Sequence, residues 1–211
     1  MPLTQQHLNG DQICVMDVET TGLQVGYHEI IQIAILPIDS EYKIRSDVAP
    51  FYIKIKPNYP ERANPEALKK NKLRLAELVL KGVDREKSRD LLEDWTDKLK
   101  LPFNKYGSRR CRIVPLGHNL NFDIDFMKQW LGPENYNYLF APTFRDTMII
   151  GSYLNDRASM LAETVPFPKL TLAFMAGHLD IPTQRAHDAL QDCLMTARLY
   201  RKMLSSHGHL W

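Results

Sequence analysis

The sequence predicts an α/β fold in which a mixed sheet is flanked by helices. Apolar or alternating segments typical of strands fill much of the first sixty residues, and helical periodicity dominates the rest. One further apolar run, between helical segments, requires a crossover connection, which favours a mixed sheet. The 211 residues suffice for one sizeable core, so we expect a single domain over residues 1–211.

The predicted strands begin with residues 13–18, 29–38 and 50–56. The third alternates apolar and polar residues, "PFYIKIK", which is typical of a strand with one face buried. The connections between these segments are short, and short connections favour antiparallel pairing. The sequence therefore predicts an antiparallel meander at the start of the chain.

Helical signals follow. Asn64 and Pro65 fit the N-cap and first position of a helix that continues through "PEALKKNKLRLAELVLKG" and ends at Gly82. Asp84 fits the cap of the next helix, "REKSRDLLEDWTDKL". The apolar run at residues 112–116 predicts another strand, although Pro115 is unusual inside a central strand.

Three further helical segments complete the chain. Periodicity predicts a helix over residues 120–131, another that starts near Thr147, and a last one over residues 186–204. The stretch "KLTLAFMAGHL" lies between the last two. The inner stripe of the last helix consists of Leu190, Leu194, Ala197 and Leu204.

The composition indicates a folded chain without a membrane segment. The apolar fraction is 44% and the charged fraction 25%, and no stretch approaches the roughly 18 uninterrupted apolar residues of a spanning helix. The net charge of +2 is compatible with a polyanionic partner but does not require one. The cysteines Cys14, Cys111 and Cys193 are scattered without CxxC spacing, so we expect a reducing, cytoplasmic location and no membrane partner.

Carboxylates occur where a purely structural role is strained. In "ICVMDVETTG" the alternation of a strand places Asp17 and Glu19 on the same face as Ile13 and Val15. Asp123, in "GHNLNFDIDF", borders the apolar stripe of a predicted helix. Taken singly, these acids also fit a surface turn, a helix cap or a half-exposed flank.

A third group lies in "RAHDALQDC", where His187 begins the last helix and Asp188 and Asp192 are one turn apart. Carboxylates from one strand and two helices offer the oxygen ligands that hard divalent cations prefer. A zinc site would need closely spaced histidines or cysteines, and no HExxH or CxxC occurs. The acids therefore predict a magnesium or manganese site.

The segments "DVETTG", "GHNLNFD" and "HDALQD", in this order, resemble the three exonuclease motifs of the DEDD superfamily. The histidine of the third motif resembles that of the DEDDh branch, which contains the proofreading subunit of bacterial DNA polymerase III, ribonuclease T and oligoribonuclease. The resemblance covers residues 11–204. It implies a ribonuclease H-like fold, with a five-stranded mixed sheet and helices on both faces.

The resemblance implies a 3′–5′ exonuclease that releases nucleoside 5′-monophosphates from DNA or RNA. Asp17, Glu19, Asp123 and Asp192 would hold two Mg²⁺ or Mn²⁺ ions, and His187 would be the general base. Asp188 is excluded because the motif selects the acid five positions after the histidine. The substrate would be a nucleic acid with a free 3′ end, single-stranded or frayed.

The same resemblance implies five substrate contacts: Thr20, Leu23, His118, Asn119 and Phe122. Leu23 matches the position of a wedge that separates bases, but it also fits a core leucine. Phe122, Phe126 and Trp130 recur at helical spacing and fit core packing better than base stacking. Two basic clusters fit either a phosphate guide or a solvated face: Lys69, Lys70, Lys72 and Arg74, and Arg109, Arg110 and Arg112.

Several alternatives stay open at this point. The motifs do not choose between proofreading, repair and RNA processing, or between a host and a viral enzyme. A binding module that has lost activity and a phosphohydrolase of small nucleotides are the alternatives from other classes. The resemblance leaves open a homodimer or an association with a polymerase.

Overall fold

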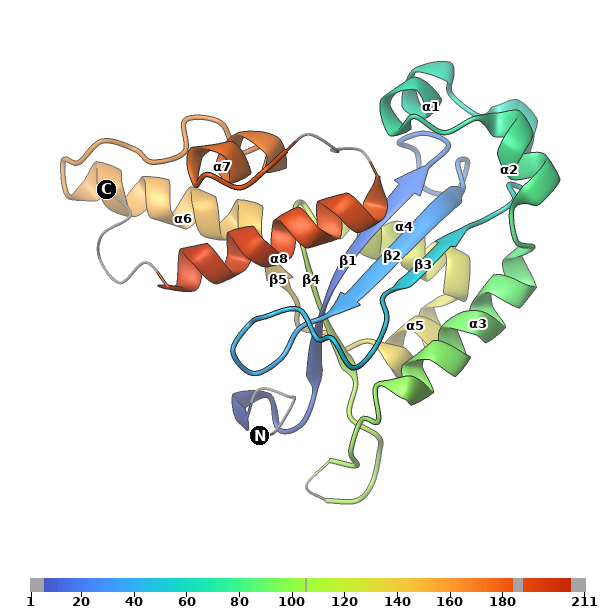
Figure 1. Cartoon of the computed structure of the whole chain (residues 1–211), viewed down its shortest axis with the longest axis horizontal. Helices are drawn as coiled ribbons and strands as arrows, with labels where there is room; N and C mark the ends of the chain where they lie inside the picture. Colours follow the sequence, from blue (N-terminus) through green and yellow to red (C-terminus); the bar gives the residue numbers. More distant parts are fainter. Residues whose placement is uncertain (1–5, 105, 184–187, 206–211) are drawn as a thin grey trace.

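The computed structural model describes residues 6–104, 106–183 and 188–205, and its centre is one mixed sheet (Figure 1). The strand order is β3-β2-β1-β4-β5; β1, β2 and β3 are antiparallel neighbours, and β4 and β5 continue the sheet in parallel. The strands are β1 Gln12–Thr20, β2 Ile30–Pro37, β3 Phe51–Lys54, β4 Ile113–Gly117 and β5 Arg145–Asp146.

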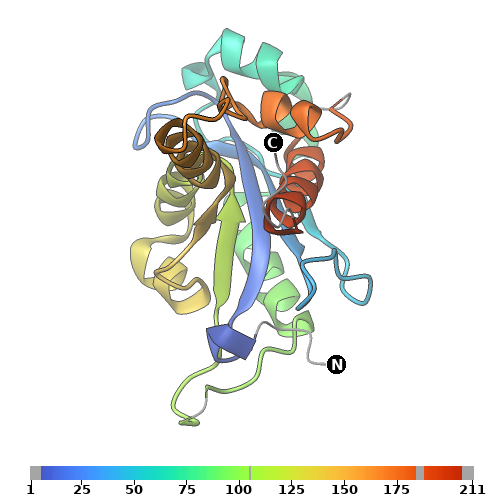
Figure 2. The ribbon, with the colours of Figure 1, turned by 90° about the vertical axis from the view of Figure 1, so that its left-hand side faces the viewer.

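Helices cover both faces of the sheet, as Figure 2 shows from the side. The helices are α1 Pro65–Asn71, α2 Leu75–Lys81, α3 Arg85–Lys98, α4 Asn121–Leu131, α5 Pro133–Leu139, α6 Thr147–Met160, α7 Leu172–His178 and α8 Ala189–Ser205. Two short 3-10 turns, η1 Gln6–Leu8 and η2 Pro60–Arg62, precede β1 and α1. The five-stranded mixed sheet flanked by helices and the antiparallel meander are confirmed.

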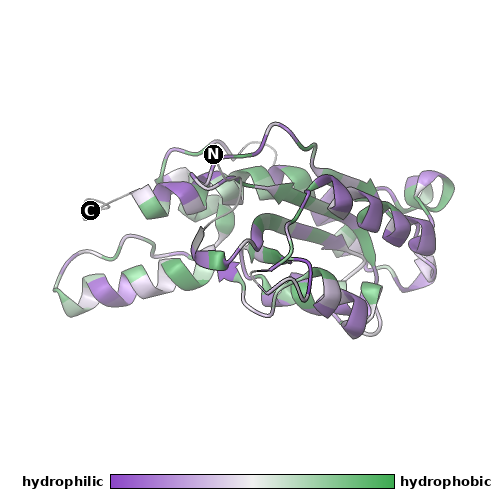
Figure 3. Cartoon of the chain, turned by 90° about the horizontal axis from the view of Figure 1, so that it is seen from below, coloured by the Kyte–Doolittle hydropathy of each residue, from purple (hydrophilic) through white to green (hydrophobic). Residues whose placement is uncertain are grey.

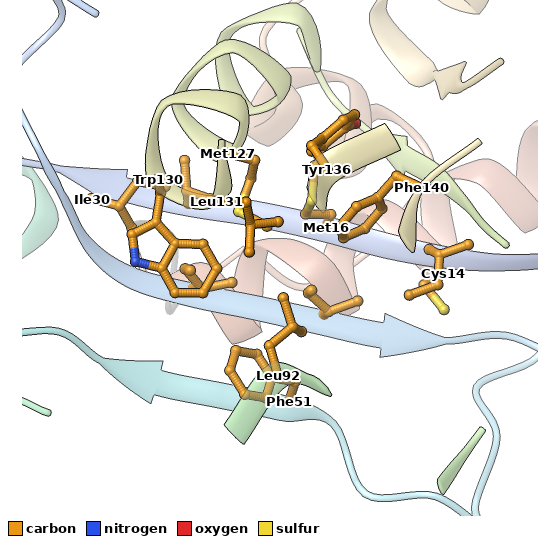
Figure 4. Close-up of a cluster of buried hydrophobic side chains, with 14 of the residues drawn as sticks. Cys14, Met16, Ile30, Phe51, Leu92, Met127, Trp130, Leu131, Tyr136 and Phe140 are labelled. Carbon is orange, nitrogen blue, oxygen red and sulfur yellow. The ribbon is translucent and has the colours of Figure 1, made fainter. Parts of the chain in front are cut away.

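The alternation of β1 decides what faces each layer of helices. Cys14, Met16 and Val18 point into a cluster with residues of α3, α4 and α5 (Figure 4). Ile13 and Val15 point the other way, into a cluster with the inner side of α8. Seen from below, hydrophobic residues follow the strands and hydrophilic ones the outer helices (Figure 3). A third cluster joins α7 to α8.

No helix in the described part of the chain is long and apolar enough to cross a membrane.

The prediction of one unbroken helix from Asn64 to Gly82 is wrong, because the chain forms two helices there. Asn64 caps α1 by accepting from the Glu66 and Ala67 N–H groups, as expected, but α1 ends at Asn71. Asn71 is buried and its Nδ2 donates to the Thr20 carbonyl, while Lys72 has left-handed backbone angles. This long-range hydrogen bond ends the helix where local periodicity would continue it.

Pro115 lies inside β4 without breaking the sheet. The Ala141 N–H donates to the Ile113 carbonyl, so the backbone groups of Ile113 face away from β1. Pro115 is two residues further and faces the same way, toward β5. Pairing with β5 begins only at Leu116 and Arg145, so the N–H that proline lacks has no partner to lose. The predicted strand is confirmed, whereas β5 and α5 were not predicted.

Gly82 ends α2 where the chain turns back against the sheet. A Cβ added there would lie 2.4 Å from the Leu78 carbonyl oxygen and 2.6 Å from the Lys56 backbone nitrogen, which are both backbone atoms. We expect Gly82→Ala to lower the free energy of unfolding by about 1–3 kcal/mol through overpacking. Chemical denaturation measures this change.

The matched control is Gly177→Ala in α7, where a Cβ would meet no atom within 4 Å. This change should be neutral or stabilise the protein by up to about 1 kcal/mol, because alanine favours the helix. Equal effects of the two substitutions would contradict the close approach at Gly82.

Candidate active site

The carboxyl end of β1 carries two acids on the face that α8 covers. Asp17 and Glu19 follow Ile13 and Val15 in the strand alternation, and Asp192 lies in the first turn of α8. One carboxylate oxygen from each of Asp17, Glu19 and Asp192 lies within 4.8 Å of the others. Three acids from two elements thus form a cluster that fits a cation.

Asp123 reaches the same place from the opposite layer of helices. It is buried on α4, and the backbone N–H of Val18, between the two strand acids, donates to its Oδ1 at 2.8 Å. Asp17, Glu19, Asp123 and Asp192 all line one cleft of about 350 Å³. The structure therefore brings together the four acids that the three motifs predict as metal ligands.

The electrostatics of this cluster favour a cation. Burial raises the pKa of Asp17 well above its ordinary value, and the neighbouring Asp123, Glu19 and Asp192 raise it further. Burial and Asp192 raise the pKa of Glu19 to about 7, against the opposing charge of Lys70. Burial likewise raises the pKa of Asp123 to about 8, although the hydrogen bond from Val18 opposes the change. Oxygen donors that resist ionisation without a counter-charge fit divalent cations.

Four of the predicted substrate contacts line the same cleft: Thr20, Leu23, Asn119 and Phe122. Leu23 is 80% exposed, so the alternative that it is a core leucine is wrong. Phe126 and Trp130 are buried, which confirms core packing for both. Phe122 is half-buried, with its ring 4.8 Å from that of Phe126, and forms part of the cleft wall.

His118 also lines the cleft, but its ring nitrogens are occupied by the protein. Nε2 lies 2.8 Å from the Leu170 carbonyl oxygen, which can only accept, so Nε2 carries the proton. Nδ1 lies 2.9 Å from Thr147 Oγ1, and this hydroxyl also lies 3.2 Å from the Gly117 carbonyl oxygen, to which it donates. Burial lowers the pKa of His118, which favours this neutral ring. His118 therefore presents ring carbons rather than free polar groups to the cleft.

The predicted general base, His187, lies outside the described residues. The residue after it, Asp188, accepts from Tyr52 Oη at 2.6 Å and from the Gln191 N–H at 3.2 Å. Gln32 donates to Tyr52 Oη and accepts from the Ala189 N–H. Asp188 thus holds the start of α8 against the sheet, which agrees with its exclusion from the ligand set.

Asp146 is a site residue that the motifs did not reveal. Its buried carboxylate accepts from the N–H groups of Asn119 and Leu120, at 3.1 and 2.8 Å, and from that of Met148 at the start of α6. It fixes the turn in which Asn119 has left-handed backbone angles, with φ 60°, directly before α4. The signal in the sequence is an aspartate before a helical run, a common N-cap.

The two basic clusters have different positions. Lys70 of α1 lines the cleft. Arg109 and Arg110 lie near the other end of β4, where they contact Asp11 at 3.7 Å and Asp97, respectively. Only the first cluster is therefore placed to meet a phosphate at the acids.

Comparison with known proteins agrees with this geometry. Residues 14–200 match the family model described as Exonuclease (RNase T). Escherichia coli exonuclease I, in a zinc-bound complex with single-stranded DNA, superposes with a TM-score of 0.70 at 17% identity, over 95% of this chain and 42% of that chain. Exonuclease I from Methylocaldum szegediense gives 0.68 at 20% identity, over 95% and 42%.

Cell-death related nuclease 4 gives a TM-score of 0.67 at 19% identity, over 94% of this chain and 65% of that chain. The chain thus spans less than half the length of exonuclease I. The shared sheet confirms the expected ribonuclease H-like fold. Because the family model covers most of its length, the chain belongs to the Exonuclease family of the DEDD superfamily.

Proposed function

We propose that the chain is a metal-dependent 3′–5′ exonuclease of the DEDDh branch that releases nucleoside 5′-monophosphates from DNA or RNA. One observation carries the proposal: four carboxylates from β1, α4 and α8 line a single cleft. Burial of these carboxylates raises their pKa values and costs free energy. A protein that only binds nucleic acid would not need such buried acids.

Asp17, Glu19, Asp123 and Asp192 would hold two Mg²⁺ or Mn²⁺ ions, which when bound supply positive charge to the phosphate oxygens and lower the pKa of water. The residues of the chain orient these ligands. The Val18 N–H holds Asp123, and the contacts of Asp188 hold the turn of α8 that carries Asp192. His187 would accept the proton of the attacking water, a role that suits the imidazole group.

The cleft suits an unpaired strand end. Its volume of about 350 Å³ is in the range of sites for one small ligand and fits a terminal nucleotide better than a duplex. Leu23 and Phe122 would contact the bases, and Lys70 would attract the phosphate. We therefore propose a single-stranded or frayed 3′ end as the substrate.

We also propose a cytoplasmic location. The described cysteines, Cys14, Cys111 and Cys193, are all free and buried. Three unpaired thiols are typical of a reducing compartment.

Asp17→Asn tests the metal cluster. We expect wild-type protein with Mn²⁺ to shorten a 5′-labelled single strand stepwise, and the variant to be at least about 100-fold slower, because a ligand to the cations is lost. Asp125→Asn, the same change at an exposed position of α4, is the control and should retain the rate. If the wild-type protein instead retards the oligonucleotide and leaves it intact, the result would support a binding module.

His187→Ala tests the general base. Turnover should fall by about 100- to 10,000-fold, while the affinity for Mn²⁺ measured by calorimetry stays close to that of the wild type. The wild-type rate should rise as pH increases toward neutrality, because a base must lose its own proton first, and the variant should lack this dependence. Turnover at the wild-type rate would dismiss this role.

The raised pKa values predict how metal-free protein responds to pH. Glu19 and Asp123 have folded-state pKa values of about 7 and about 8, above their unfolded values near 4, so the folded state binds more protons between these limits. Their contribution to stability is fully present below about pH 4 and is lost as pH rises through about 8.

Thermal unfolding in EDTA should show this loss, and Mn²⁺ should raise the Tm more at pH 8 than at pH 5. Asp17→Asn should reduce the loss between these pH values, whereas Asp125→Asn should keep it. Identical pH dependence in the wild type and in Asp17→Asn would contradict the mutual repulsion of the acids.

A further inference from the structure

The loop between β1 and β2 (Figure 1) and the segment before η2 carry exposed apolar side chains. Leu23 is at the cleft itself, and Val25, Tyr27 and Tyr59 are 42%, 45% and 47% exposed. The Asn64 N–H, just after η2, donates to the Thr21 carbonyl at 2.7 Å, which holds the chain around η2 against the loop between β1 and β2. A group of exposed apolar side chains at the rim of a site marks an interaction surface.

The loop that carries Tyr27 is held in one conformation. The Gly26 N–H donates to Gln129 Oε1 at 2.8 Å, and Gln129 Nε2 donates to the His28 carbonyl at 2.9 Å. The Gln24 N–H donates to His28 Nδ1 at 3.1 Å. At Gly22 a Cβ would lie 2.3 Å from His28 Nε2, so the ring packs directly on this glycine. A loop fixed before binding loses little conformational entropy when a ligand arrives.

Arg62 joins the two exposed tyrosines. Its guanidinium carbon lies 3.9 Å from the ring centroid of Tyr59 and 5.2 Å from that of Tyr27. The Tyr59 N–H donates to Glu29 Oε2 at 2.8 Å, which holds the backbone of Tyr59 beside the start of β2. Among the residues that the structure describes, Arg62 makes no ion pair.

The chemistry of this group fits an unpaired nucleobase with its phosphate. Aromatic faces stack on bases of any sequence, and an arginine in the stack adds a planar surface and a positive charge. Tyrosine and arginine also occur at protein interfaces, but Arg62 adds to the ring faces a charge that the phosphate of a nucleotide can use. Leu23 lines the acidic cleft and lies four residues before Tyr27 on the same loop, so the rings belong to a segment that borders the cleft.

We propose that Tyr27, Arg62 and Tyr59 form a base-stacking subsite that holds an unpaired nucleobase of the strand whose end enters the acidic cleft. The inference rests on the proposed function. The subsite acts on binding and not on the chemical step, because none of its residues lines the cleft that contains the acids.

Binding to oligonucleotides with one abasic position tests the subsite directly. A fluorescent single strand is titrated with the 211-residue chain in EDTA, and the abasic position is moved one nucleotide at a time from the 3′ end. Wild-type affinity should fall about tenfold when the abasic position reaches the subsite. The double variant Tyr27→Ala with Tyr59→Ala should bind the intact strand about tenfold more weakly and show no further loss at that position.

Matched variants separate stacking from folding. Tyr27→Phe with Tyr59→Phe keeps both rings and should restore the wild-type pattern. Tyr138 lies on α5, away from the proposed subsite, and is 74% exposed. Tyr138→Ala should therefore leave the affinity and its positional pattern unchanged. If the double alanine variant keeps the positional loss of the wild type, the proposal is overturned.

Hydrolysis of the same strands with Mn²⁺ distinguishes the two proposals. The double alanine variant should raise KM about tenfold with little change in kcat. If the wild type hydrolyses the strands and the double alanine variant has the same KM, the subsite alone would be overturned. Positional loss in EDTA without any hydrolysis would overturn the proposed function and leave the subsite standing.

Discussion

Repulsion among buried carboxylates is the constraint on which the site depends. Asp17 and Glu19 come from one strand face, and Asp123 and Asp192 are delivered by helices on opposite faces of the sheet. Asp123 is held in place by the backbone of Val18, so it cannot move far from the strand acids. The fold therefore keeps like charges together that would separate if they were free. Without a cation the acids relieve this cost by holding protons, as their raised pKa values show, whereas a cation lets them ionise together, which makes cation binding the natural use of the cluster.

The sheet topology explains why three distant segments bring the four acids together. The side chains of β1 alternate between two layers of helices, and its carboxyl end lies beside the starts of α4 and α8. Asp146 and Asp188 lie near these helix starts and bind backbone or side-chain donors instead of the cleft. Aspartates thus take two roles here: some line the cleft, and others accept hydrogen bonds that fix the helix starts. The hydrogen-bond partners of each carboxylate decide its role.

Much of this arrangement could be predicted from the sequence, because alternation and caps are local. The meander, the start of α1 at Asn64 and the acids of β1 are examples. The convergence of the acids required the order of the three motifs, since periodicity does not bring distant segments together. The break after Asn71 could not be predicted, because it depends on a hydrogen bond to Thr20. The same holds for the contacts of Arg62 with Tyr27 and Tyr59, since stacking across separate segments leaves no periodic signal.

The most direct measurement of the central claim is the number of Mn²⁺ ions that each chain binds, counted by electron paramagnetic resonance of free Mn²⁺ during a titration. We expect two ions for the wild type and a loss of affinity in a variant that replaces Asp192 by asparagine while the fold, checked by circular dichroism, is retained. Absence of Mn²⁺ binding by the folded wild-type chain, or equal binding by the two proteins, would contradict the proposal that the acids form a metal centre.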